Sequence, residues 1–394
     1  LLGLLGAGLL VACTAAPATP PPSPPLPSAT PAPTPLAPTA VLLSPTAALR
    51  PPASAALSPP ASAAGEVPIV VGQGAQQLRG QGSTFALPLY NLWFQQYTKL
   101  HPTVAFSYQP DGSGAGLAAL QQGHVDFAAS DIPPAAGAPP GLVQIPAVAG
   151  AVVLAYQGTG LPPGLVLDGD TAAAIFSGQI QQWNDPAIMA LNPGVALPGT
   201  PIRIVHRADA SGTTAIFTSY LAHVNSNWQG TIGSGETVAW PVGQAAAGSA
   251  GVVARLQQTD GALGYMGLTT AVQARLAYAR LKNQAGSVVE ATVESIGAAG
   301  DDLQGDLGAS VVNSPDPESW PIVGFTYLVV DHDLHTLPDG AHAQALVDFL
   351  SWTAQDGQRS VEDLFYASPN AAVQTQIKAI LRTLTYRGQP LAVP

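Results

Sequence analysis

Cysteine and charge are both scarce in this sequence of 394 residues. Cys13 is the only cysteine, which excludes an intramolecular disulfide and a cysteine-based metal site. Charged residues make up 9% of the chain and the formal net charge is −11, so bulk electrostatics disfavour a nucleic-acid or anionic-membrane partner. Any anion that binds here must be held by local dipoles and by one or two cations.

The first thirteen residues are apolar and mostly small. Leu1 to Leu10 is rich in leucine and glycine, and small residues stand just before Cys13. This pattern is typical of a secretory signal peptide and resembles a lipobox, in which the cysteine is acylated and becomes the mature N-terminus. We therefore expect residues 1–13 to be a truncated lipoprotein signal peptide with lipidation at Cys13. The alternative is a truncated membrane span, although a dozen residues is short for a span of about twenty.

Residues 14–65 consist mainly of Pro, Ala, Thr, Ser and Leu, with Arg50 as the only charge. Prolines recur too often for a helix or a sheet, and there is too little large apolar surface to fold on. The composition predicts a disordered linker that tethers a folded module. A glycosylated stalk stays open as an alternative.

From residue 66 onward, strand patterns alternate with helix patterns, which indicates an α/β fold with helix-covered sheets. Two long apolar runs, Ile145–Tyr156 and Trp320–Val330, predict buried strands, and the first is compatible with a strand that crosses between lobes. The alternating run that ends at Val205 predicts a strand, and the run from Ala215 predicts a helix. We also expect a short helix over Leu117–Gln122 and a helix over Asp170–Phe176 that is capped at its first residue.

Three junctions between a strand and a helix share one design, with a hydroxyl residue at or next to the helix start and glycines nearby. They contain Ser83-Thr84-Phe85, Ser113 within Asp111–Gly116, and Ser211-Gly212-Thr213. Ser211 is a good N-cap residue, and Gly212 allows the backbone to come close to a ligand. Because the N–H groups of a first helical turn have no intrahelical partner, such ends attract small anions.

Three charged residues give this anion hypothesis its specificity. Residues two apart on a strand share a side, so Asp209 can hold Arg207 in an ion pair that leaves some guanidinium donors for a ligand. An ordinary surface ion pair would have the same spacing, and the helix start that follows favours the functional interpretation. Asp131 repels anions unless the anion carries a proton to donate, as phosphate does at neutral pH and sulfate does not. A structural capping role for Asp131 is the alternative.

Other chemistry is weakly supported by the sequence. Gly112-x-Gly114-x-Gly116 lacks the full spacing of a dinucleotide-binding loop, and neither Ser113 nor Ser211 lies in a GxSxG elbow. We expect His206, on the opposite side of its strand from Arg207, to be a packing or surface residue. An exposed turn explains the pair His332 and His335 better than a metal site does. We expect no metal and no cofactor.

The ordered motifs closely resemble the phosphate-binding protein of the bacterial high-affinity phosphate ABC importer. The likeness covers about residues 78–390 and rests on these stretches: Gly82–Phe85, Gly112-Ser113, Val125–Asp131, Trp183–Pro186 with Leu191–Gly194, Arg207–Thr213, Thr237–Pro241 and Gly261–Tyr265. The resemblance implies a type II periplasmic-binding-protein fold. Its two α/β lobes, joined by two crossover strands, would close on the ligand. We place lobe 1 at about 66–148 and 324–394, and lobe 2 at about 149–323.

By position, the resemblance also implies a set of phosphate contacts with Asp209 orienting the arginine. The implied contacts are Thr84, Phe85, Ser113, Asp131, Arg207, Ser211, Gly212 and Thr213. Ala210 stands where the family often has Gly, and His206 where it often has another basic residue; neither is expected to change the ligand.

The sequence thus predicts a monomeric, lipid-anchored, extracytoplasmic receptor that is not an enzyme. It would capture inorganic phosphate and deliver it to the membrane permease of an ABC importer. Two alternatives stay open. One is a secreted phosphatase-like or ester-hydrolysing enzyme that uses Ser113 or Ser211, although no base or metal set accompanies either serine. The other is an adhesin on a Pro-rich stalk, which leaves the three junctions unexplained.

Overall fold

The computed structural model describes residues 68–132, 141–301 and 307–394. Cys13 and the predicted segments 1–13 and 14–65 lie outside these residues. Over the three described ranges, no helix combines the length and the apolar character needed to cross a bilayer.

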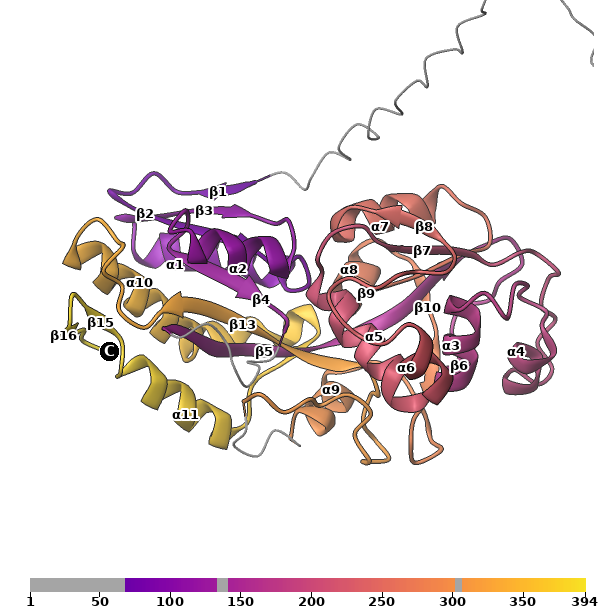
Figure 1. Ribbon diagram of the computed structural model, residues 1–394. Helices are drawn as coiled ribbons and strands as arrows, with labels where there is room; N and C mark the ends of the chain where they lie inside the picture. The colour runs from indigo at the N-terminus through magenta and orange to yellow at the C-terminus, as the bar shows by residue number, and fades with distance from the viewer. Residues whose placement is uncertain (1–67, 133–140, 302–306) are drawn as a thin grey trace, which may run out of the picture. The chain divides into compact units, whose positions relative to one another are not determined.

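One sheet of eleven strands organises the described chain (Figure 1). The strands on its main path are, in spatial order, β1 (Ile69–Val71), β3 (Val104–Gln109), β2 (Gln76–Gly82), β4 (Phe127–Ser130), β13 (Val323–Asp331), β5 (Leu142–Gln157), β9 (Ala262–Gly267), β7 (Arg203–Arg207) and β8 (Gln244–Ala246). Two further strands, β10 (Ala277–Tyr278) and β14 (Tyr366–Ala367), also pair with β5.

Small sheets and helices complete the described elements. A three-stranded sheet has the order β12 (Val288–Val289), β11 (Arg280–Lys282) and β6 (Val166–Asp168), and a hairpin joins β15 (Thr385–Tyr386) to β16 (Gln389–Pro390). The helices are α1 (Leu87–Leu100), α2 (Ser113–Gln121), α3 (Gly169–Phe176), α4 (Pro186–Leu191), α5 (Gly212–Val224), α6 (Ser226–Thr231), α7 (Gly248–Gln257), α8 (Leu268–Gln273), α9 (Val293–Gly300), α10 (Gly340–Thr353) and α11 (Ala371–Leu381), with short 3-10 turns η1 (Asp356–Ser360) and η2 (Glu362–Leu364).

The strand β5 belongs to both halves of the large sheet. Residues 142–151 pair with β13, and residues 152–157 pair with β9 on the other side. All residues from Ile145 to Tyr156 are buried, as expected for a strand covered on both faces. The predicted α/β fold with two lobes and two long crossover strands is therefore confirmed. We call the part around β1–β4, α1, α2 and α10 the first lobe, and the part around β6–β9 and α3–α7 the second lobe.

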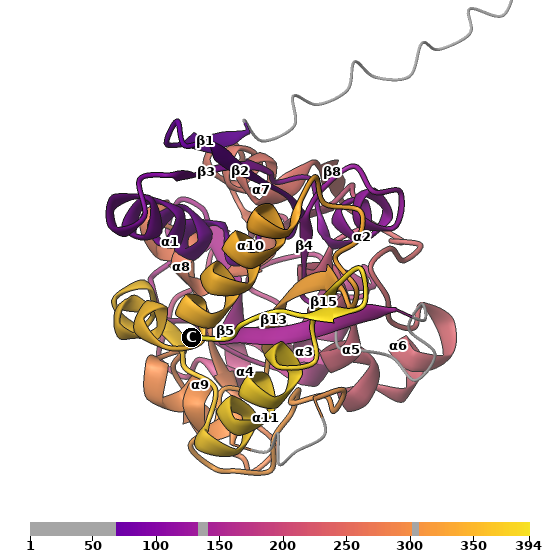
Figure 2. The ribbon, with the colours of Figure 1, turned by 90° about the vertical axis from the view of Figure 1, so that its left-hand side faces the viewer.

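An aromatic cluster fills the first lobe. Phe94 of α1 stacks on Phe106 of β3 with ring centroids 4.5 Å apart, and Phe349 of α10 lies 4.7 Å from Phe106. The two helices come from opposite ends of the described chain and lie close together over the strands (Figure 2). The first lobe is therefore complete only when the C-terminal part of the chain returns to it.

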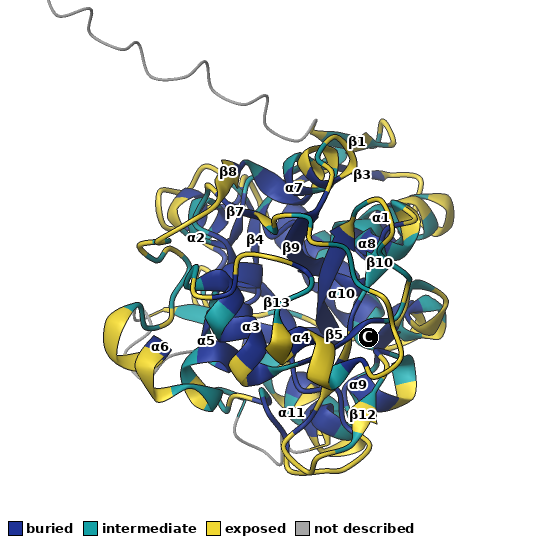
Figure 3. Cartoon of the chain, turned by 90° about the vertical axis from the view of Figure 1, so that its right-hand side faces the viewer, coloured by how far each residue is buried: buried dark blue, intermediate teal, exposed yellow. Residues whose placement is uncertain are grey.

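A second aromatic cluster fills the second lobe. Phe217 of α5 stacks on Tyr265 of β9 at 4.7 Å, and Trp240 stacks on the same tyrosine at 5.6 Å. These rings hold the start of α5 against the sheet. The strands of both lobes form the buried interior, and the exposed residues lie on the outer helices and loops (Figure 3).

Two helix starts differ from the sequence prediction. Helix α2 begins at Ser113, four residues before the predicted start at Leu117, and Gly112 is its N-cap with φ of 104°. The glycine-rich sequence hides this first turn, but the packing requires it: a Cβ on Gly116 would lie 2.4 Å from the carbonyl oxygen of Gln81. Similarly, α3 is capped by Asp168, which accepts from the backbone N–H of Thr171, and not by Asp170.

The crossover strand β13 offers a test of the packing between the two lobes. A Cβ on Gly324 would lie 2.3 Å from Cδ1 of Ile216 in α5. We expect Gly324→Ala to lower the free energy of unfolding by about 1–3 kcal/mol in urea denaturation, because the core there has no room for a methyl group. The matched control is Gly230→Ala in α6, where no described atom outside the backbone of its own helix lies within 4 Å of the added Cβ. An equal stability of the two variants would contradict this description of the crossover.

Candidate functional site

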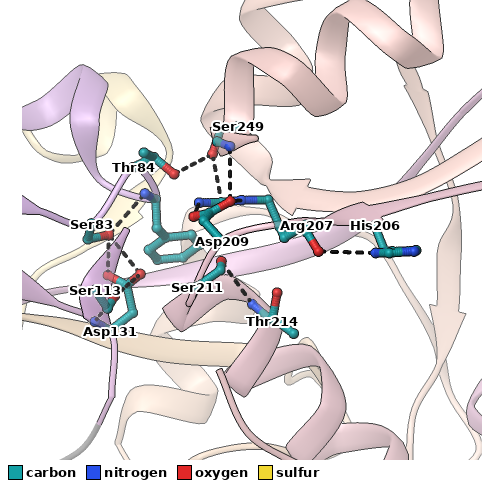
Figure 4. Close-up of polar contacts among 12 residues, drawn as sticks. Ser83, Thr84, Ser113, Asp131, His206, Arg207, Asp209, Ser211, Thr214 and Ser249 are labelled. Carbon is teal, nitrogen blue, oxygen red and sulfur yellow. Dashed lines mark hydrogen bonds and ion pairs between the residues drawn. The ribbon is translucent and has the colours of Figure 1, made fainter. Parts of the chain in front are cut away.

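The three predicted junctions meet at the boundary between the two lobes (Figure 4). Ser83, Thr84 and Phe85 occupy the turn between β2 and α1, and Ser113 is the first residue of α2. Asp131 follows β4 directly. From the second lobe, Arg207 ends β7, and Ser211 caps α5. The sheet thus brings residues separated by more than a hundred positions to one place.

Asp131 lies at the centre of this site, inside a cage of hydroxyl groups. The Ser83 hydroxyl donates to it, with Oγ 2.7 Å from both carboxylate oxygens, and Oγ1 of Thr326 donates to Oδ1 at 2.7 Å. The Ser113 hydroxyl lies farther away, at 3.4 Å from Oδ2. Both donors to Oδ1 lie at 2.7 Å, whereas the second donor to Oδ2 lies 3.4 Å away, so Oδ2 keeps the greater capacity to accept a further hydrogen bond.

The burial of Asp131 determines its proton affinity. Its residue surface is only 1% exposed. This burial raises the pKa of the Asp131 carboxyl to about 6, although the hydrogen bonds from Ser83 and Thr326 and the charge of Arg207 all lower it. The carboxyl is therefore ionised at neutral pH, and it is held as a hydrogen-bond acceptor.

Arg207 supplies the positive charge of the site. Its Nε donates to Oδ1 of Asp209 at 2.8 Å and its Nη2 pairs with Oδ2, so the guanidinium is clamped in the predicted bidentate arrangement. Burial raises the pKa of Asp209, but the hydrogen bonds and charge of Arg207 outweigh it and hold that pKa below its usual range. The Tyr265 hydroxyl accepts from the backbone N–H of Arg207 at 3.1 Å and bonds Thr214 at 2.7 Å, which fixes β7 against α5.

The first turn of α5 faces the first lobe. Ser211 caps the helix, as predicted, by accepting from the backbone N–H of Thr214. A Cβ on Gly212 would lie 2.5 Å from Oγ of Ser113 and 2.6 Å from Oδ2 of Asp131, so only glycine permits this approach. The hydroxyl of Thr213 is buried and has no hydrogen-bond partner among the described residues. A buried donor of this kind, at the positive end of a helix, suits an anion.

Direct contacts join the two lobes around this site. Oγ1 of Thr84 lies 2.8 Å from Oγ of Ser249 in α7, and the N–H of Gly114 donates to the carbonyl of Ala210 at 3.2 Å. The N–H of Phe85 donates to Oγ of Ser83 at 3.0 Å, so a contact of this N–H with a ligand requires that bond to be shared. The lobes are therefore closed on one another in this structure.

The structure brings all the predicted contact residues into one region, and it adds others that were not among the predicted contacts. The additional residues are Ser83, Tyr265, Ser249 and Thr326. Ser83 and Tyr265 lie within recognised motifs, so their positions carried a signal. Ser249 and Thr326 lie in stretches without a motif. The side chain of His206 lies on the opposite side of β7 from that of Arg207, as predicted (Figure 4). Its Nδ1 lies 3.0 Å from the carbonyl oxygen of Arg207, and its ring stacks on Trp240 with centroids 5.1 Å apart.

Metal and nucleophile chemistry find no support in the geometry. Across the residues that the structure describes, no three His, Cys, Asp or Glu side chains are grouped to hold a metal ion. The hydroxyl of Ser113 bonds Asp131, and that of Ser211 caps α5. Within the same described ranges, neither serine has a hydrogen bond to a histidine.

Comparison with known proteins finds a matching family model and similar phosphate-binding proteins. Residues 70–356 match the PBP superfamily domain. The phosphate-binding protein PstS of Xylella fastidiosa (strain 9a5c) is 34% identical over 310 residues, which cover 77% of this chain and 84% of that protein. The phosphate-binding protein PstS of Methanocaldococcus jannaschii is 35% identical over 315 residues, which cover 72% and 79%.

Solved structures share the fold at lower sequence identity. A high-affinity periplasmic phosphate-binding protein (PfluDING), solved with bound phosphate, aligns with a TM-score of 0.63 and 22% identity, covering 77% of this chain and 93% of that one. A putative phosphate ABC transporter substrate-binding protein from Clostridium perfringens, also with bound phosphate, aligns with a TM-score of 0.56 and 17% identity, covering 75% and 100%.

The raised pKa of Asp131 predicts a pH dependence of stability. An unfolded carboxyl titrates near pH 4, so between about pH 4 and 6 the folded chain binds more protons than the unfolded chain. The contribution of Asp131 to stability is therefore greatest below about pH 4 and falls by about 3 kcal/mol as the pH rises past 6. In Asp131→Asn the amide does not titrate, so this fall in stability does not occur.

Without phosphate, we expect the free energy of unfolding of Asp131→Asn to rise relative to wild type between pH 4 and 7. Chemical denaturation at several pH values measures this difference. A difference that stays constant over this range would show that the Asp131 carboxyl titrates at its ordinary pKa.

Proposed function

This chain belongs to the PstS family of phosphate-binding proteins within the PBP superfamily, and on that premise we propose that it captures inorganic phosphate between its lobes and delivers it to an ABC importer. Proteins of this kind are extracytoplasmic receptors and not enzymes. The observation that carries the proposal is the ionised, caged Asp131 facing the clamped Arg207 and the start of α5.

We propose the following roles at the site. Thr84, Phe85, Ser113, Ser211, Gly212 and Thr213 donate hydrogen bonds to phosphate, Arg207 supplies positive charge, and Asp131 accepts the proton of the ligand. The unpaired hydroxyl of Thr213 and the spare capacity of Asp131 Oδ2 support these roles. Asp209 orients the guanidinium of Arg207 through its bidentate pair. The site therefore matches donors to oxygens and one acceptor to the single proton of HPO₄²⁻.

The lobes themselves are the moving parts of this proposal. We place the first lobe at about 66–148 and 324–394 and the second at about 149–323, so that β5 and β13 serve as the hinge. Ligand entry then requires the contacts of Thr84 with Ser249 and of Gly114 with Ala210 to break. In this proposal the receptor works as a monomer, since one chain supplies groups to both sides of the ligand, and its partner is the permease of the importer.

Binding selectivity tests the function. We expect the phosphate-stripped protein to bind phosphate at micromolar concentration or below in isothermal titration calorimetry, and sulfate to fail as a competitor at neutral pH. Asp131→Asn should allow sulfate to compete, because the amide removes the charge that repels it.

Arg207→Ala tests the role of the positive charge in phosphate binding. Removing the charge of a buried partner should weaken phosphate binding by at least about 2 kcal/mol. No phosphate binding by wild type, or sulfate competing as well as phosphate, would refute the proposed function.

We also propose that Cys13 is acylated and anchors the receptor to the membrane. The support is the run of apolar and small residues before this cysteine and the proline-rich stretch 14–65 that follows it. When the gene is expressed with its full signal peptide, the wild-type protein should sediment with membranes, and Cys13→Ser should be released into the soluble extracytoplasmic fraction. Equal distribution of the two proteins would refute the anchor.

A further inference from the structure

Ser249 links the two sides of the site and belongs to none of the recognised motifs. It is the second residue of α7, in the second lobe, and is 6% exposed. Its Oγ lies 2.8 Å from Oγ1 of Thr84 in the first lobe, and Nη1 of Arg207 donates to it at 3.4 Å. Figure 4 shows Ser249 between these two residues. The serine therefore contacts one proposed ligand contact from each lobe.

Arg207, Ser249 and Thr84 form a chain of hydrogen bonds, and the donors available in each group determine its direction. A guanidinium can only donate, so the Ser249 oxygen accepts from Arg207 and keeps its own hydrogen. The bond between Ser249 and Thr84 can run either way. If Thr84 donated to Ser249, it would present only lone pairs to a bound anion, which is repulsive. An anion therefore selects the order in which Arg207 donates to Ser249, Ser249 to Thr84, and Thr84 to the ligand.

We propose that Ser249 is a positioning residue that orients the Thr84 hydroxyl toward bound phosphate and latches the lobes closed. This inference rests on the proposed function. Each hydrogen bond in the chain polarises the next, so the donor strength of Thr84 depends on Ser249 and, through it, on Arg207. The specificity for a protonated anion stays with Asp131, on the opposite side of the Thr84 turn.

The position of Ser249 also predicts which rate constant of phosphate binding it affects. Thr84 and Ser249 lie on different lobes, so their hydrogen bond forms only after closure and contributes to holding the ligand. We therefore expect Ser249→Ala to raise koff for phosphate by about 5- to 20-fold and to leave kon within about twofold. The ratio of phosphate to sulfate affinity should not change, because Asp131 is unaltered.

A double-mutant cycle distinguishes positioning from a general structural effect. In a Thr84→Val background, where the chain is already broken, Ser249→Ala should change koff by less than about twofold. In a Thr84→Ser background, which keeps the hydroxyl, its full effect should remain. Stopped-flow displacement of phosphate measures koff in each variant.

Ser319→Ala is the matched control, because it removes a buried hydroxyl of the second lobe that bonds the carbonyl of Asp316 at 2.9 Å. It should leave koff for phosphate unchanged. Should Ser249→Ala fail to fold, Ser249→Cys keeps the size of the side chain, substitutes a weak donor, and should still raise koff.

Three results would overturn the inference. They are an unchanged koff in a folded Ser249 variant, equal effects of Ser249→Ala in the Thr84→Val and Thr84→Ser backgrounds, and a loss of affinity that comes from kon alone. Failure of the wild-type chain to bind phosphate would overturn the proposed function as well, whereas each of the other results leaves that function intact.

Discussion

A buried carboxylate that faces the positive end of a helix is the interaction on which this site depends. Asp131 accepts hydrogen bonds from the hydroxyls of Ser83 and Thr326, and its Oδ2 lies against the start of α5 at Gly212. A negative charge in this position would repel a fully ionised anion. Under the proposed function it would make the site selective for a ligand that still carries a proton, and the surrounding hydroxyls hold that carboxylate in place.

The clamped guanidinium is the counterpart of this carboxylate. Asp209 occupies two donors of Arg207, so the remaining donors point in fixed directions, and Tyr265 secures the backbone of the same residue. Neither lobe has the full set of groups, because Asp131 comes from the first lobe and Arg207 from the second. Closure of the lobes is thus what assembles the acceptor and the donors around one ligand.

Local sequence patterns predicted most of the fold, because a long apolar run indicates a buried strand and periodic apolar residues indicate a helix wherever they occur in the chain. The run Ile145–Tyr156 lies within β5, and the predicted cap at Ser211 is present. The start of α2 was wrong because its glycines are required by packing against β2, which no local pattern records. Thr326 and Ser249 escaped prediction for a similar reason: each acts through a residue more than 150 positions away.

The path of the chain has a consequence for its export through a membrane. The second lobe is nearly continuous in sequence. The first lobe is complete only once β13 has been synthesised, because β13 pairs with β4, almost two hundred residues earlier in the chain. Until the C-terminal part of the chain emerges, β4 has an unpaired edge, and such edges promote aggregation. Under the proposed function, anion capture becomes possible only at the end of synthesis, and a chain truncated before β13 would contain most elements of the second lobe beside an incomplete first one.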